Sequence, residues 1–150
     1  MSKRSGWRWG NVPLPETYLV GLGAGLLLQV VVPWRPPWPA PAGQAVGWPL
    51  LLAGLGLATW AVRAAAEVDL EHPDQLVRGG PYAVSRNPMY VASALVYAGV
   101  ALVTGVVWLL ALLPGVLVAT HVVVVREERV LDGRFGAAYR SYRRSVRRWL

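Results

Sequence analysis

The sequence predicts an all-α integral membrane protein with four transmembrane helices and a C-terminal amphipathic helix at the membrane interface. Hydrophobic residues make up 55% of the 150-residue chain and charged residues only 15%, whereas soluble domains usually carry about 25% charged residues. Uncharged apolar segments recur along the chain, and a helix needs roughly 20 such residues to cross the hydrocarbon of a bilayer. We therefore expect a single membrane-embedded domain over residues 1–150.

The spans are expected at residues 16–33, 45–66, 88–104 and 106–125. The third and fourth cannot be one helix, because together they far exceed one crossing of the bilayer. Thr104-Gly105 offers a turn between them, so we predict that they form a tight helical hairpin.

A different pattern follows the fourth span. Aromatic and apolar residues recur there at steps of three and four, at positions Phe135, Tyr139, Tyr142, Val146 and Trp149. Arginines fill the other faces, at positions Arg140, Arg143, Arg144, Arg147 and Arg148. This spacing predicts an interfacial helix over about residues 134–149 whose arginines bind anionic lipid headgroups.

The charge distribution predicts the topology. The chain has 15 Lys+Arg against 8 Asp+Glu, and nearly all the basic residues lie at the ends of apolar segments. They cluster before the first span, between the second and third, and after the fourth. By the positive-inside rule, both termini and the middle loop are cytoplasmic in a multi-pass protein of the inner membrane. The same placement argues against a nucleic-acid partner.

Two further absences narrow the chemistry. The chain has no cysteine, which excludes disulfides, thiolate metal sites and cysteine nucleophiles. Its two histidines are far apart in the sequence, so we expect no metal centre. The oligomeric state stays open.

The start of the third span is a candidate binding site. Asn87 suits the N-cap of a helix and Pro88 its first turn. Just upstream, Gly80 permits a turn that brings Tyr82 and Arg86 back against the helix end. A helix N-terminus with an arginine beside it attracts carboxylate or phosphate.

A polar stripe continues from this point into the span. Arg86, Tyr90, Ser93 and Tyr97 recur at steps of four, three and four, which places them on one helical face. Hydrogen bonding to a neighbouring helix explains Ser93 and Tyr97 as well as a pocket does. For Arg86 and Tyr90, at the mouth of the stripe, we favour a binding function.

Glu127 and Glu128 directly follow the apolar segment of the fourth span. A carboxylate so close to hydrocarbon is costly unless it is solvated, paired or bound to a ligand; Arg126 and Arg129 are one possible source of pairing. His121 lies two turns earlier on the same face, roughly 10 Å deeper. It is a candidate contact for a substrate, and a hydrogen bond to a neighbouring helix is the alternative.

These motifs together resemble a known family. Their order is Leu76-Val77-x-x-Gly80-Pro81-Tyr82, Ser85-Arg86-Asn87-Pro88-Met89-Tyr90, Glu127-Glu128-x-x-Leu131, Phe135-Gly136-x-x-Tyr139-x-x-Tyr142 and Val146-x-Arg148-Trp149. The combination resembles the isoprenylcysteine carboxyl methyltransferases and their phospholipid methyltransferase relatives, especially small bacterial members.

The resemblance implies S-adenosylmethionine as cofactor and a lipophilic acceptor that arrives from the bilayer. By motif position, the cofactor-binding residues would be Gln75, Leu76, Val77, Gly80, Tyr82, Arg86, Asn87, Pro88, Tyr90, Glu127 and Glu128. Tyr97 and His121 would contact the acceptor. Methyl transfer can be accelerated by positioning and by exclusion of water, so we assign no catalytic residue.

The leading hypothesis is therefore a membrane methyltransferase whose acceptor is an isoprenylcysteine carboxylate, a phospholipid amine or a similar group. Two alternatives stay open. One is a membrane reductase of the sterol-reductase type that uses NADPH, because such enzymes share a similar C-terminal pattern. The other is a non-catalytic four-helix protein whose tail binds anionic lipid.

Overall fold

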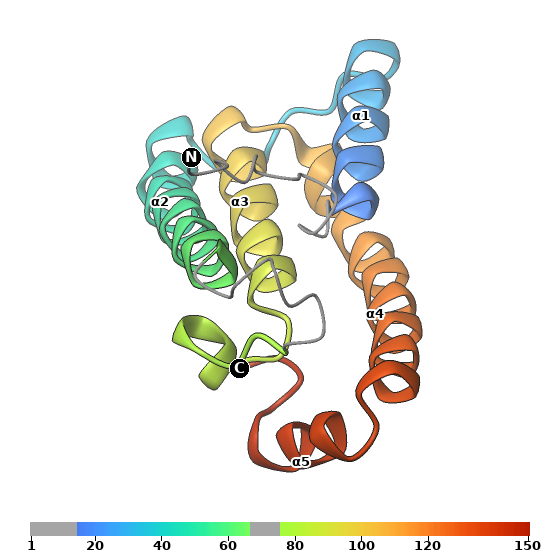
Figure 1. The fold of residues 1–150 in the computed structure, drawn as a ribbon. Coiled ribbons are helices and arrows are strands. Elements are labelled where there is room, and N and C mark those ends of the chain that lie inside the picture. The colour runs from blue at the N-terminus through green and yellow to red at the C-terminus, as the bar shows by residue number, and fades with distance from the viewer. Residues whose placement is uncertain (1–14, 67–75) are drawn as a thin grey trace, which may run out of the picture.

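The computed structural model describes residues 15–66 and 76–150, and it confirms the all-α class for these ranges. They contain five α-helices, one short 3-10 helix and no β-strand (Figure 1). The elements are α1 (Glu16–Val31), α2 (Ala40–Ala66), η2 (Gly80–Ala83), α3 (Pro88–Thr104), α4 (Val107–Phe135) and α5 (Ala137–Ser145).

The predicted hairpin is confirmed. α3 ends at Thr104, Gly105 adopts a left-handed conformation with φ 70°, and α4 begins at Val107. By length and composition, α2 and α4 can each cross a membrane, while α1 and α3 are shorter apolar helices of 16 and 17 residues. The sequence expectation of four spans therefore stays a prediction for α1 and α3.

The helix that carries the fourth expected span is longer than the span, and the helix expected at about residues 134–149 has different boundaries. α4 continues through the charged residues to Phe135 and ends at Gly136, which has φ 50°. Charge did not stop the helix because glutamate and arginine are good helix formers. α5 is correspondingly shorter than expected, and the chain leaves it at Val146 in an extended conformation. The prediction of one helix over residues 134–149 thus missed a break at each end.

Small residues bring α2 and α3 into close contact. A Cβ added at Gly99 of α3 would lie 2.6 Å from the backbone nitrogen of Leu51, and one at Gly54 of α2 would lie 2.8 Å from that of Val96. Two backbones can approach this closely only where side chains are absent, as in many membrane helix pairs. α2 and α3 therefore form one closely packed pair.

α1 also packs on α4 through small residues, but there the glycines of one helix receive side chains of the other. Gly21 and Gly25 of α1 face side chains of α4, and the hydroxyls of Thr17 and Thr120 form a hydrogen bond of 2.7 Å. The outward faces are apolar, with Val20, Val30 and Val118 between 66% and 80% exposed. Exposure of such residues to water is unfavourable by about 25 cal/mol per Å², whereas contact with lipid carries no such cost.

The two ends of the bundle differ in character. At one end, the α1–α2 connection meets the hairpin turn, and the rings of Trp34 and Trp108 pack edge to face with centroids 5.3 Å apart. At the opposite end lie η2, the charged part of α4, α5 and the C-terminus (Figure 1). The candidate site residues from separate parts of the sequence meet at this second end.

The α2–α3 contact yields a stability test. Gly99→Ala should destabilise the protein by about 1–3 kcal/mol, because the added methyl overlaps the α2 backbone. Gly56→Ala is the matched control: a Cβ there meets nothing within 4 Å, and it gains the same helix propensity. Thermal unfolding in nanodiscs measures both variants, and equal stabilities would contradict the packing described.

Candidate functional site

The turn before α3 is fixed by a glycine. Gly80 has φ 58°, a conformation that favours glycine, and a Cβ there would lie 2.9 Å from the Cβ of Ala64 in α2. η2 therefore lies directly against the end of α2. From this position the chain passes through Tyr82 and Arg86 into α3.

Asn87 and Pro88 begin α3 as predicted. The side chain of Asn87, however, does not accept the hydrogen bond from a free backbone N–H that is expected of an N-cap asparagine. Asn87 is the N-cap residue without a side-chain cap. Its Nδ2 instead donates to the carbonyl oxygen of Arg148 at 3.1 Å. The C-terminal tail thus competes successfully for this side chain, and Asn87 joins α3 to the tail.

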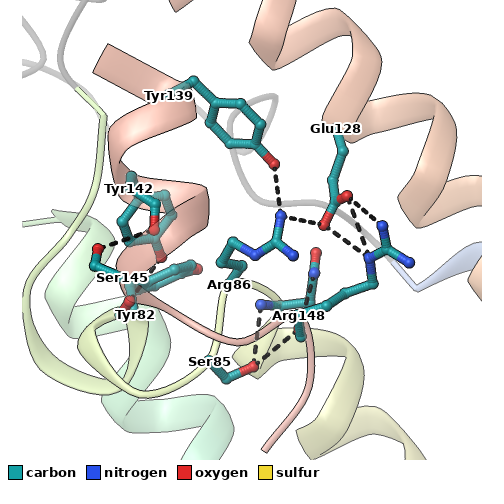
Figure 2. Close-up of polar contacts among 9 residues, drawn as sticks. Tyr82, Ser85, Arg86, Glu128, Tyr139, Tyr142, Ser145 and Arg148 are labelled. Carbon is teal, nitrogen blue, oxygen red and sulfur yellow. Dashed lines mark hydrogen bonds and ion pairs between the residues drawn. The ribbon is translucent and has the colours of Figure 1, made fainter. Parts of the chain in front are cut away.

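Glu128 lies between two arginines from opposite ends of the second half of the chain (Figure 2). Its Oε1 pairs with Arg86 Nη1 and its Oε2 with Arg148 Nη2, each at 2.9 Å. Arg86 Nη1 also donates to the Tyr139 hydroxyl at 3.4 Å. The Arg86 and Glu128 side chains are only 9% and 7% exposed. We call Arg86, Glu128, Tyr139 and Arg148 the buried charge cluster.

Glu127 faces a different neighbour. Its Oε1 accepts a hydrogen bond of 2.8 Å from the Tyr90 hydroxyl. Tyr90 is buried, whereas Glu127 is partly exposed. The two glutamates therefore differ in environment: Glu128 is held by two guanidiniums, while Glu127 keeps a partly accessible carboxylate beside Tyr90.

The C-terminal segment closes this end of the bundle. The amide of Arg86 donates to the Arg147 carbonyl at 2.9 Å, within an isolated parallel bridge between Ser85 and Arg147. The Tyr142 hydroxyl donates to the Tyr82 carbonyl at 2.6 Å. The contacts join residues 61 and 60 positions apart, so α5 and the tail are fastened to the entry of α3.

Burial alters the titration of the tyrosines in this region. It raises the pKa of Tyr142 to about 12 and raises the pKa of Tyr82. It also raises the pKa of Tyr139, against the opposing effect of Arg86. The hydrogen bond to Glu128 raises the pKa of Arg148. All four groups keep their ordinary charge states at neutral pH.

Several predicted site residues converge, and others do not. Arg86, Asn87, Tyr90, Glu127 and Glu128 meet between α3 and α4 through the contacts above. Pro88 is fully buried at the start of α3. Gly80 and Tyr82 lie in η2, a few residues before Arg86. Leu76 and Val77 precede them and are half-buried. Gln75 lies outside the described residues.

The two residues predicted to contact an acceptor are separated. Tyr97 is buried in the bundle, where its ring packs edge to face on Tyr18 with centroids 6.0 Å apart. His121 is exposed on α4, and its ring centroid lies 6.1 Å from that of Trp149. Their ring neighbours differ: Tyr97 packs on α1, and His121 lies beside the C-terminal tail.

The sequence analysis assigned Arg148 wrongly to lipid headgroups. Tyr139 and Arg148 both belong to the buried charge cluster, and neither was predicted there. Helical periodicity placed Arg148 on a solvated face, but the chain is no longer helical at that point. One sequence feature could have assigned Arg148 to the site: it belongs to Val146-x-Arg148-Trp149, the last of the family motifs.

Comparison with known protein families shows which family this chain belongs to. Residues 43–138, well over half of the chain, match the phospholipid methyltransferase family. The chain belongs to the phospholipid methyltransferase family. Family membership and the two long apolar helices support a membrane methyltransferase. Among curated proteins and among solved structures, no match was found.

The two glutamates should differ in their effect on stability. Glu128→Gln should lower the free energy of unfolding by about 3 kcal/mol, because it leaves two buried or half-buried guanidiniums without their counter-charge. Glu127→Gln should cost less than 1 kcal/mol, since the amide oxygen still accepts from Tyr90. Chemical unfolding in detergent measures both, and a larger loss for Glu127→Gln would contradict the cluster.

Alkaline titration tests the docking of α5. Because burial favours neutral Tyr142 in the folded protein, this contribution to stability is present below pH 10 and is lost as the pH rises toward 12. The difference in tyrosinate absorbance between wild type and Tyr142→Phe should therefore have a midpoint near 12. A midpoint near 10 would show that α5 does not bury this hydroxyl.

Proposed function

We propose that this family member is an S-adenosylmethionine-dependent methyltransferase that acts on a lipophilic acceptor at the cytoplasmic face of the inner membrane. The observation that carries the proposal is the convergence of Arg86 and Tyr90 with Glu127 and Glu128 at one end of the bundle. Family membership supports the class of reaction, and this convergence supports its location between α3 and α4.

The polar groups present suit this cofactor. Arg86 Nε is buried and has no hydrogen-bond partner among the described residues, so it is a donor available to a carboxylate such as that of the methionine moiety. The partly exposed carboxylate of Glu127 is an acceptor suited to an ammonium group or to ribose hydroxyls. The carboxylate and the ammonium group of the methionine moiety would thus each meet a protein group of opposite charge.

The protein's contribution to the reaction would be positioning and exclusion of water. When bound, S-adenosylmethionine supplies an electrophilic methyl group. Arg86 is held in place by Glu128 and Tyr139, and Tyr90 orients Glu127, so both ligand-facing groups are preorganised. The C-terminal tail covers this end of the bundle and restricts water. No acid or base is assigned.

The arrangement also supports the proposed topology of four spans. Arg78, Arg86 and the arginines of α4 and α5 belong to one end of the bundle, while Arg35 belongs to the connection at the other end. The positive-inside rule places the arginine-rich end in the cytoplasm. Exposed arginines on α5 would then hold that helix at anionic headgroups. A water-soluble cofactor would enter at this end, and an apolar acceptor from the bilayer.

Calorimetric titration of the protein in nanodiscs tests the cofactor. S-adenosylmethionine should bind, NADPH should not, and Arg86→Lys should weaken binding about tenfold or more because it removes the buried Nε donor. Arg144→Lys, an exposed substitution in α5, is the matched control and should bind like wild type. Binding of NADPH alone would favour a reductase, and binding of neither would favour a non-catalytic protein.

Transfer of label tests the acceptor. Protein incubated with membranes and methyl-labelled S-adenosylmethionine should place the label in the organic phase of a lipid extract, because the acceptor is expected to be apolar. Heat-treated protein is the control. Label confined to water-soluble products would contradict a bilayer-derived acceptor.

A further inference from the structure

A second polar feature lies on the other flank of Glu128. It is a hollow of about 230 Å³ between α4 and the C-terminal segment, lined by Val125, Glu128, Arg129, Asp132, Arg143 and Arg148. Three of these six side chains are arginines. One of them, Arg129, comes from α4, and the other two come from α5 and the tail, so the hollow exists only because the tail folds back.

The hollow is separate from the Tyr90–Glu127 side of the helix. Each residue turns an α-helix by about 100°, so Glu127 lies about 100° to one side of Glu128. By the same rotation per residue, the side chains of α4 that line the hollow lie on the opposite side of Glu128. They are Asp132, Val125 and Arg129, at about 40–100° from it. The ion pair of Glu128 with Arg148 forms the wall between the two regions.

The charges around the hollow are not balanced. Glu128 and Asp132 supply two negative charges. The guanidiniums that pair with them or line the hollow number five, namely Arg86, Arg129, Arg140, Arg143 and Arg148. Three positive charges in this group are therefore unmatched. Among the described residues, neither Arg129 nor Arg143 forms an ion pair, although both line the hollow.

An apolar strip leads from the hollow along α4. Val118, Val122, Val125 and Arg129 follow at steps of four, three and four, on one face of the helix. Val118 is 66% and Val122 45% exposed. At the border of this strip the Trp149 ring lies beside His121. A positively charged hollow that continues into an exposed apolar strip has the polarity of a phospholipid: an anionic head and a hydrocarbon chain.

We propose that this hollow binds the phosphate of an anionic membrane phospholipid, with an acyl chain along Val118 and Val122. Guanidiniums bind phosphate through paired N–H donors, and Arg129, Arg143 and Arg148 offer such donors from two segments of the chain. The bound phosphate fastens the C-terminal segment to α4. This lipid is a structural ligand, and the proposal does not depend on methyl transfer.

Native mass spectrometry of the full chain in detergent tests the site. The protein is titrated with phosphatidylglycerol, and the double variant Arg129→Gln/Arg143→Gln is compared with Arg126→Gln/Arg144→Gln. Both variants lose two positive charges, one from α4 and one from α5, but Arg126 and Arg144 are exposed and do not line the hollow. Wild type and the control should each retain one tightly bound lipid, because the control removes only general headgroup attraction outside the hollow. The hollow variant should bind about tenfold or more weakly.

Equal weakening of lipid binding in both double variants would show that the lipid is attracted by general surface charge, and would overturn the proposal. Unchanged binding in the hollow variant would also overturn it. Competition by inorganic phosphate or glycerophosphate at the lipid's own concentration would show that the acyl chain contributes nothing, and would overturn the lipid assignment. Calorimetry with S-adenosylmethionine on the hollow variant gives an independent readout. Selective loss of cofactor binding there would assign the hollow to the cofactor site instead.

Discussion

The tertiary structure at the arginine-rich end depends on one buried carboxylate. Glu128 accepts from Arg86, which precedes α3, and from Arg148 in the C-terminal tail. A buried charge is tolerated only when it is paired and its remaining lone pairs are satisfied, and here both oxygens are occupied. Without Glu128, the two guanidiniums would repel each other across the same space. The carboxylate therefore fixes the positions of three segments that are distant in the sequence.

The rest of the bundle makes this arrangement possible. Glycine contacts hold α2 against α3, and the α1–α4 pair is joined by small residues and the Thr17–Thr120 hydrogen bond. The short turn at Gly105 connects the two pairs at one end only, so the opposite ends of α3 and α4 need other contacts to stay together. The buried charge cluster and the tail supply these contacts, through hydrogen bonds that are strong where water is excluded.

The paired glutamates illustrate how one dipeptide serves two purposes. Successive residues on a helix point about 100° apart, so Glu127 and Glu128 face different neighbours although they are adjacent. Glu128 stabilises the fold, and Glu127 remains partly accessible beside Tyr90. The same geometry places the arginine-lined hollow beyond Glu128. A single ion pair, Glu128 with Arg148, thus separates the proposed cofactor region from the proposed lipid site.

Apolar segment length and turn residues alone determined the helical class, the α3–α4 hairpin and the start of α3 at Pro88, because these depend on local composition and backbone sterics. Family motifs also singled out Arg86, Glu127 and Glu128, which the structure brings together at one end of the bundle. Only the tertiary structure decided their partners. Periodicity placed Arg148 on a lipid-facing helix, yet the tail leaves the helix at Val146 because backbone pairing with Ser85 and the pairing of Arg148 with Glu128 are available there. Such contacts join residues distant in sequence, and no local pattern encodes their distance.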